Sequence, residues 1–234
     1  MTESLHIFST LAVQGAMPAL AAGYKSLAGA RLLVEYAPTN GLMARIDAGE
    51  RADVAILTRE GADQLAVRGV LRPDSVVDVA RSYVGIAVRA GAAKPDISSP
   101  EALKAALLTA KSIAYSRIGA SGILFARLIQ QLGIAEAVNA KATIIPSGFT
   151  AELVARGEVE LAVQQVSELM VVPGVHIVGP LPAPLQSPAM FSAGVFADCA
   201  EPAEAERLLQ FLTSTVAAPM LQAAGLEPAL TTHR

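Results

Sequence analysis

The chain has 234 residues, of which 53% are hydrophobic and 17% charged, and its formal net charge is −3. This composition excludes disorder and leaves room for one large domain or two smaller lobes, while the lack of any basic run argues against nucleic-acid binding. The single cysteine, Cys199, excludes an internal disulfide, and no cysteine–histidine cluster has the spacing of metal ligands, so we expect no metal site.

Residues 5–23 resemble the apolar part of a secretory leader. However, polar residues interrupt the run, and no Lys or Arg precedes it. No other segment contains the roughly 20 apolar residues that a membrane span needs. We therefore expect no membrane insertion, and a cytoplasmic location for the chain as given or a periplasmic one if a leader has been removed.

Apolar runs that alternate with helical patterns predict an α/β fold with mainly parallel strands. Three strands are predicted first, and a helix follows each of them. The strands are 5–8, 31–36 and 52–57, and the helices are 11–27, 42–49 and 59–69. Each helix is preceded by a polar turn, and the three turns are Ser9-Thr10, Thr39-Asn40 and Thr58-Arg59.

The segment 75–91 has two apolar runs with little turn material between them, which indicates that the chain enters a second sheet. A helix is predicted at 98–110, because Ser98 or Ser99 can cap it and Pro100 suits its first position. Further strands are predicted at 112–116, 142–146 and 160–165, with helices at 123–133 and 151–157. The run 190–197 then returns to the first sheet, and 204–225 forms a closing helical pair. The predicted lobes are residues 1–82 with 193–234, and residues 83–192.

Four residues, Ser116, Arg117, Ser121 and Gly122, lie in or beside the turn before the helix at 123–133. A helix N-terminus has unpaired N–H groups and roughly half a positive charge, so it can bind an anion. If this turn faced Ser9 and Thr10, each lobe would contribute one helix terminus to the same anion. The alternative is that each hydroxyl only caps its own helix.

Six stretches, in this order, resemble the molybdate-binding-protein-like branch of the type 2 periplasmic binding proteins. They are IFSTLA, YAPTNGLMARIDAGERADVAI, YVGIAVRAGAAKPDI, ASGILFARLIQQLGI, ELAVQQVSEL and VGPLP, and together they span nearly the whole chain. The resemblance implies two Rossmann-like lobes with a ligand cleft between them. It also implies a small anion held by hydroxyl and backbone N–H groups, and an ABC permease as partner if the protein is exported.

By this resemblance the family's hydroxyl pair corresponds to Ser9 and Thr10, and its second turn to Thr39 and Asn40. Asn40 stands where the family usually has Ser, and Gln165 where molybdate binders tend to have Tyr. Amide groups suit a carboxylate better than a tetrahedral oxyanion. Arg59 and Arg117, beside two of the turns, either pair with ligand carboxylates or are solvated on a rim. The ligand expected is thus a small anion, and a di- or tricarboxylate ahead of molybdate.

An enzymatic function is a second hypothesis. Ser121 is not in a G-x-S-x-G motif, and the chain has neither G-x-G-x-x-G nor a phosphate-loop lysine, so no cofactor is expected. The stretch ELAVQQVSEL, followed by VGPLP, also resembles the aconitate isomerases, which move a proton and a double bond in a tricarboxylate. Candidates to carry that proton are Tyr115, Ser116 and Glu168, although no spacing singles one out and Glu168 can equally cap or pair locally.

Overall fold

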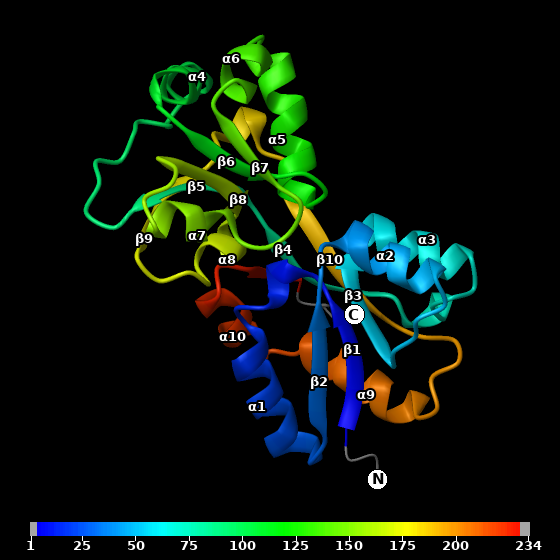
Figure 1. Cartoon of the computed structure of the whole chain (residues 1–234). Helices are drawn as coiled ribbons and strands as arrows, with labels where there is room; N and C mark the ends of the chain where they lie inside the picture. The colour runs from blue at the N-terminus through cyan, green and yellow to red at the C-terminus, as the bar shows by residue number, and fades with distance from the viewer. Residues whose placement is uncertain (1–3, 230–234) are drawn as a thin grey trace. The chain divides into compact units, whose positions relative to one another are not determined.

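The computed structural model describes residues 4–229, and the chain divides into two compact units (Figure 1). Unit 1 comprises Met1–Ser82 and Ala189–Arg234, and unit 2 comprises Tyr83–Pro188. The second passage between units was expected between residues 192 and 193. It comes at Pro188, because the whole of strand β10 (Ala189–Val195) pairs within the sheet of unit 1. Each unit has one sheet covered by helices, which confirms the predicted α/β fold class.

The sheet of unit 1 has the strand order β11-β4-β10-β3-β1-β2. Strands β1, β2 and β3 are parallel to one another, and β10 runs antiparallel to both β3 and β4. The remaining bounds are β1 Ser4–Ser9, β2 Arg31–Tyr36, β3 Val54–Thr58, β4 Val77–Ser82 and β11 Glu227–Pro228.

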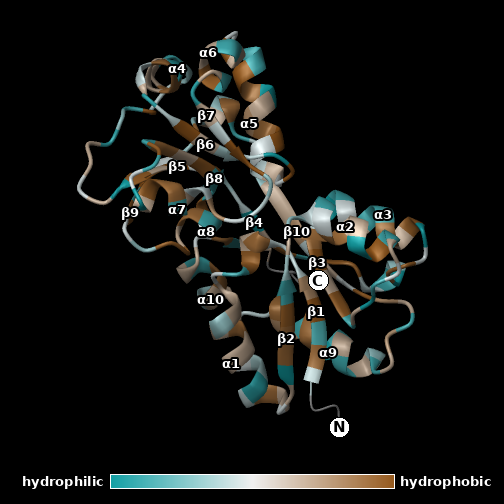
Figure 2. Cartoon of the chain, in the orientation of Figure 1, coloured by the Kyte–Doolittle hydropathy of each residue, from teal (hydrophilic) through white to brown (hydrophobic). Residues whose placement is uncertain are grey.

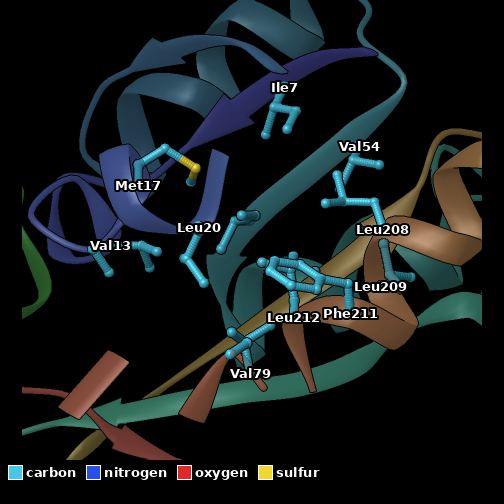
Figure 3. Close-up of a cluster of buried hydrophobic side chains, with 14 of the residues drawn as sticks. Ile7, Val13, Met17, Leu20, Val54, Val79, Leu208, Leu209, Phe211 and Leu212 are labelled. Atoms are coloured by element: carbon cyan, nitrogen blue, oxygen red, sulfur yellow. The ribbon is translucent and has the colours of Figure 1, made fainter. Parts of the chain in front are cut away.

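Both faces of this sheet are covered, which is why its central strands are apolar runs (Figure 2). Along β3, Val54 and Ile56 enter one core cluster while Ala55 and Leu57 enter the other, because successive side chains of a strand point to opposite faces. Figure 3 shows the first of these clusters. It is closed by α1 (Met17–Ala28), α9 (Pro202–Leu212) and α10 (Ala218–Ala223). The second cluster is closed by α2 (Thr39–Asp47) and α3 (Arg59–Val67).

The first predicted helix is wrong at its start. Residues Leu11–Val13 form a 3-10 turn, and α1 begins only at Met17. Pro18 explains the shift, because proline has no N–H and its ring clashes with the preceding turn, so it fits only the first turn of a helix. A second 3-10 turn, Pro73–Ser75, precedes β4.

The sheet of unit 2 has the order β7-β6-β8-β5-β9, in which β6 is parallel to β7 and β8 while β5 is antiparallel to β8 and β9. Its strands are β5 Val84–Arg89, β6 Ile113–Ser116, β7 Ala142–Ile145, β8 Leu161–Gln165 and β9 Val175–Pro180. Its helices are α4 Pro100–Thr109, α5 Ala120–Gln131, α6 Ala135–Asn139, α7 Thr150–Ala155 and α8 Val166–Leu169, with a 3-10 turn at Ala183–Leu185.

The start of α4 is as predicted, since the Ser99 hydroxyl accepts a hydrogen bond from the Ala102 N–H and Pro100 is the first helical residue. The start of α5 differs from the prediction: the helix begins at Ala120 instead of residue 123, so Ser121 lies inside its first turn. The short helices α6 and α8 were not predicted. Within residues 4–229 no helix is both long and apolar enough to cross a membrane.

The two sheets share one plan. The run β2-β1-β3-β10-β4 of unit 1 and the run β7-β6-β8-β5-β9 of unit 2 have the same sequence of parallel and antiparallel neighbours. Ser9, which ends β1, therefore corresponds to Ser116, which ends β6. By the same correspondence, Thr58 at the end of β3 matches Gln165 at the end of β8.

Candidate functional site

In each unit the first strand of the parallel set, β1 in unit 1 and β6 in unit 2, lies between the next two strands of the chain. The connections therefore run first to one side of that strand and then to the other. In unit 2, α5 connects β6 to β7 on one side of β6, and α7 connects β7 to β8 on the other side. These two helices contribute to different core clusters and so cover opposite faces of the sheet. Ligands of open α/β sheets bind beyond the carboxyl ends of the strands at such a reversal. The candidate sites are therefore the ends of β6 and β8 in unit 2, and the ends of β1 and β3 in unit 1.

Ser116 is the clearest feature at the end of β6. Its side chain is 3% exposed, and its hydroxyl oxygen has no hydrogen-bond partner. The hydroxyl faces the start of α5, since Cβ atoms placed on Gly119 and Gly122 would each lie 2.7 Å from Ser116 Oγ. A buried polar group without a partner costs on the order of 1–3 kcal/mol of folding stability. A ligand bound at this strand end would supply the missing hydrogen-bond partner.

The start of α5 is open toward that hydroxyl. Gly119 occupies the N-cap position with extended backbone and provides no side-chain cap. The first N–H groups of the helix, including those of Ser121 and Gly122, have no acceptor within the helix. Ser121 is 1% exposed. The structure thus brings Ser116, Ser121 and Gly122 together at one uncapped helix N-terminus, the element expected to bind an anion.

Gln165 ends β8, which neighbours β6 in the sheet. It is 2% exposed, and its side chain faces the Glu168 N–H in a capping-box arrangement, but its Oε1 makes no hydrogen bond of normal geometry and is the second such buried side-chain atom within residues 4–229. Both unpartnered atoms therefore belong to the last residues of the two strands that flank the reversal. This coincidence marks the strand ends of unit 2 as the better-defined candidate site.

Glu168 lies beside Gln165, in the first turn of α8. It is 7% exposed, and its Oε2 accepts a hydrogen bond from the Gln165 N–H at 3.3 Å. Burial raises the pKa of its carboxyl from 4.5 to about 8, and hydrogen bonds from the Gln165 backbone and the Gln164 side chain only partly oppose that shift. Burial thus favours the protonated, neutral form of Glu168, which would not repel an anion at the neighbouring strand ends.

Arg117 follows Ser116 and is exposed. Its backbone N–H donates to the Ile145 carbonyl at 2.8 Å, which joins the loop after β6 to the end of β7. Its guanidinium group forms no ion pair with any residue in the described part of the chain. The cation is thus available to a ligand carboxylate. The same range contains no group of three or more His, Cys, Asp or Glu residues that could hold a metal ion.

A buried amide fixes the loop between β7 and α7. Gln164 Oε1 accepts hydrogen bonds from the N–H and the hydroxyl of Thr150 at 2.8 and 3.0 Å, and Gln164 Nε2 donates to the Gly148 carbonyl at 2.9 Å. Sequence reasoning missed this loop, although the residues Pro146-Ser147-Gly148 are a turn signal directly after a strand. The loop lies at the same edge of the sheet as Ser116 and Gln165.

In unit 1 most of the predicted hydroxyl groups have a hydrogen-bond partner within the unit, Thr58 and Thr39 as acceptors and Ser9 as a donor. Thr58 caps α3 by accepting from the Gly61 N–H at 3.3 Å, and Thr39 accepts from the Thr58 N–H at 3.1 Å. The Thr58 contact matches the capping alternative, whereas Thr39 does not cap its own helix, α2, whose N-cap residue is Pro38. Ser9 is fully buried and donates to the Thr10 carbonyl at 3.1 Å, while Thr10 precedes the first 3-10 turn without capping it.

Asn40 and Arg59 complete the predicted set in unit 1. Asn40 is the second residue of α2 and is exposed. Arg59 pairs with Asp63 at 2.9 Å and with Asp78 at 3.0 Å, and Asp78 also accepts from the Ser192 hydroxyl. These two carboxylates raise the pKa of Arg59 and accept hydrogen bonds from its Nε and Nη1 atoms. Unlike Arg117, it is already paired within its own unit.

Tyr115 belongs to the core. Its ring packs edge-on against Phe125, with centroids 5.1 Å apart, and its hydroxyl donates to Asn139 Oδ1 at 2.7 Å. Burial raises its pKa. Tyr115 points to the face of the sheet that α5 covers, so we do not retain it as a candidate for proton transfer.

A cavity of about 670 Å³ in unit 1 lies elsewhere, between the start of β4 and α9. Because β4 runs parallel to β3, this is the opposite edge of the sheet from Thr58. Its one cation, Arg72, is already paired with Asp74 and Glu206. Neither of the two unpartnered buried polar atoms in residues 4–229 lines this cavity, which favours the strand ends of unit 2.

Residues 5–227 match the family described as bacterial extracellular solute-binding protein. The chain belongs to this family. An aconitate isomerase from Pseudomonas sp. is 36% identical over 231 residues, which cover 96% of this chain and 88% of that protein. These findings confirm the resemblance inferred from the sequence.

Solved structures of solute-binding proteins have the same fold. The periplasmic molybdate-binding protein of Azotobacter vinelandii has a TM-score of 0.80 at 19% identity, with 95% of this chain and 98% of that chain covered. The sulfate-binding protein of Mycobacterium tuberculosis has a TM-score of 0.76 at 17% identity, with 97% and 87% covered. At these identities the likeness establishes the fold, and the ligand must be argued from the site.

Proposed function

We propose that the chain binds a small anion, with one anionic group held at the N-terminus of α5 by Ser116, Ser121 and the first N–H groups of the helix. The observation that carries this proposal is the buried Ser116 hydroxyl, which faces that uncapped helix start and has no partner. An anion there would accept from the hydroxyl and from the helix N–H groups together, and the helix dipole would favour its charge. The cleft expected between the units stays a prediction.

The other groups at these strand ends favour an organic di- or tricarboxylate over molybdate or sulfate. The unpaired guanidinium of Arg117 can form two parallel hydrogen bonds with a carboxylate. The buried Gln165 amide can serve a ligand group as donor or acceptor, because its oxygen and nitrogen exchange places when the amide flips. A ligand with several carboxylates could engage these separate groups at once, whereas a single tetrahedral ion offers one centre of charge.

A thermal-shift panel tests this function, because a ligand that binds only the folded protein raises its Tm. The panel contains molybdate, tungstate, sulfate, malonate, citrate and both aconitate isomers. We expect a saturable rise with at least one carboxylate and its loss in Ser116→Ala. Val67→Ala, at an 88% exposed position on α3, is the control and should keep the full shift. No shift with any anion would refute the proposal.

Isomerisation of aconitate is the second candidate function, and the 36% identity to an aconitate isomerase favours it. The reaction needs a group that removes and returns a proton next to a grip on the carboxylates. Ser116 and Glu168 remain as candidates at the strand ends. Incubation of the protein with cis- or trans-aconitate, followed by ultraviolet absorbance, decides: interconversion supports the enzyme, and saturable binding without interconversion supports a binder only.

The two functions imply different partners and locations. A binding protein would deliver its anion to an ABC permease outside the cytoplasmic membrane, whereas an isomerase would need no permease and would act in the cytoplasm. Fractionation of cells that express the natural protein separates these cases. Recovery from the periplasm supports the transport function, and recovery only from the cytoplasm argues against it.

A further inference from the structure

Phe149 is unusual among the six phenylalanines of the chain. The other five are at most 4% exposed and belong to the core clusters of the two units. Phe149 is only partly buried and belongs to none of these clusters. Phe149 therefore keeps part of its apolar surface accessible, outside the two hydrophobic clusters of unit 2.

The backbone on both sides of Phe149 is held firmly. Gly148 precedes it with a φ of 95°, a conformation that favours glycine. The Gly148 carbonyl accepts from the Gln164 amide, and the Thr150 N–H donates to that same amide. Gln164 is itself 2% exposed. One buried side chain thus fixes the backbone of the residue before and of the residue after Phe149, and so the place from which its side chain projects.

The place so fixed is the carboxyl end of β7, at the same edge of the sheet as the candidate site. β7 pairs with β6 up to Ser116 and Ile145, and the next residue, Arg117, donates its N–H to Ile145. The loop that carries Phe149 therefore adjoins the loop that carries Arg117. Gln164 connects the Phe149 loop to β8, where Gln165 is the next residue. Phe149 and Arg117 thus lie on the adjacent loops after β7 and β6, and Gln165, whose Oε1 has no partner, ends the neighbouring strand β8.

We propose that Phe149 is a specificity-determining residue that selects an anion with a hydrocarbon skeleton over an inorganic oxyanion. The inference rests on the proposed function. A carboxylate ligand would place its charged ends on Arg117 and the start of α5 and its carbon chain against the Phe149 ring, removing apolar surface of both from water. Sulfate and molybdate have no apolar surface, so the ring would add nothing to their binding.

Titration calorimetry on the full chain tests this selectivity with citrate, cis-aconitate and trans-aconitate against sulfate and molybdate. The variants are Phe149→Ala, which removes the ring, and Phe149→Leu, which keeps an apolar side chain. We expect Phe149→Ala to weaken carboxylate binding roughly five- to twentyfold and to leave oxyanion binding within about twofold. Phe149→Leu should restore most of the carboxylate affinity. Val67→Ala should change neither.

The outcomes separate this inference from the function on which it rests. If wild-type protein binds none of the anions, the proposed function fails. If it binds only sulfate or molybdate, or if Phe149→Ala weakens all anions equally, anion binding stands and the role of Phe149 is refuted. If Phe149→Ala does not fold, Phe149→Gln, which replaces the ring with a polar side chain, decides: a ratio of carboxylate to oxyanion affinity reduced relative to wild type supports the inference, and an unchanged ratio refutes it.

Discussion

Gly122 lies against the end of β6 so closely that a Cβ at this position would be 1.8 Å from the Ser116 carbonyl oxygen. That atom is backbone, so it cannot rotate away. The first turn of α5 therefore packs directly on the strand end, and this contact holds the helix N–H groups beside the Ser116 hydroxyl. Only glycine permits the approach, so the geometry of the candidate site depends on the backbone packing as well as on the polar side chains.

Gly122→Ala should lower the free energy of unfolding by about 3 kcal/mol or more, because the added methyl group must displace the strand or the helix. Urea denaturation measures the change. Gly41→Ala in α2 is the matched control, since its Cβ would meet its nearest side-chain atom at 3.5 Å, an ordinary contact. It should leave stability unchanged or raise it by up to about 1 kcal/mol. Equal effects of the two substitutions would contradict the close approach.

Ser116→Ala should abolish the stabilisation by ligand without lowering the stability of the ligand-free protein. The hydroxyl is buried without a partner, so its removal should leave the ligand-free protein equally stable or about 1 kcal/mol more stable while the ligand-induced rise in Tm disappears. Ser75→Ala is the contrast, because the Ser75 hydroxyl donates to the Arg72 carbonyl and accepts from the Val195 N–H. It should cost about 1–3 kcal/mol and keep the ligand response. If Ser116→Ala lowered stability and kept ligand binding, the Ser116 hydroxyl would serve the fold and not the ligand.

Alanine substitution of Arg117 should reduce ligand affinity, whereas alanine substitution of Arg59 should reduce stability. Arg117 has no ion pair within residues 4–229, so its loss should reduce carboxylate affinity roughly tenfold and reduce the salt dependence of binding, with little effect on stability. Arg59 is paired with Asp63 and Asp78, so its loss should cost about 1 kcal/mol of stability and leave affinity nearly unchanged. Calorimetry at two ionic strengths and urea denaturation measure both. Equal loss of affinity would place both arginines at the ligand.

The sequence predicted the fold class well because apolar strands and amphipathic helices leave a clear periodicity, and it predicted that Ser99 or Ser98 caps α4. It was less reliable where one residue overrides the pattern, as Pro18 does at the start of α1. It also located the strand-end hydroxyls but not which of them are engaged. That distinction depends on partners distant in sequence, such as Thr39 for the Thr58 N–H, 19 residues apart. Periodicity carries no information on such pairs.

Glu168 should make folding stability depend on pH in an unusual direction for a carboxyl group. Its pKa is about 8 in the folded chain and near 4.5 when exposed, so between these values the folded state holds a proton that the unfolded state has released. The free energy of unfolding therefore falls as pH rises from 4.5 to 8, by an amount on the order of 5 kcal/mol. On the strands packed against α8, the only charged or titratable side chains are Arg89 and His176, and neither contributes to this shift.

Glu168→Gln removes this titration but keeps an oxygen that can accept from the Gln165 N–H. Urea denaturation from pH 5 to 9 should show a flatter profile for the variant than for wild type, with the gain in stability growing toward high pH. Above pH 8 the wild type should also bind anions more weakly than Glu168→Gln. The reason is that an ionised Glu168 beside Gln165 repels the ligand in wild type only. The control is Glu152→Gln, at an exposed position of α7, which should reproduce the wild-type profile. Parallel profiles for wild type and Glu168→Gln would mean that Glu168 ionises normally in the folded protein.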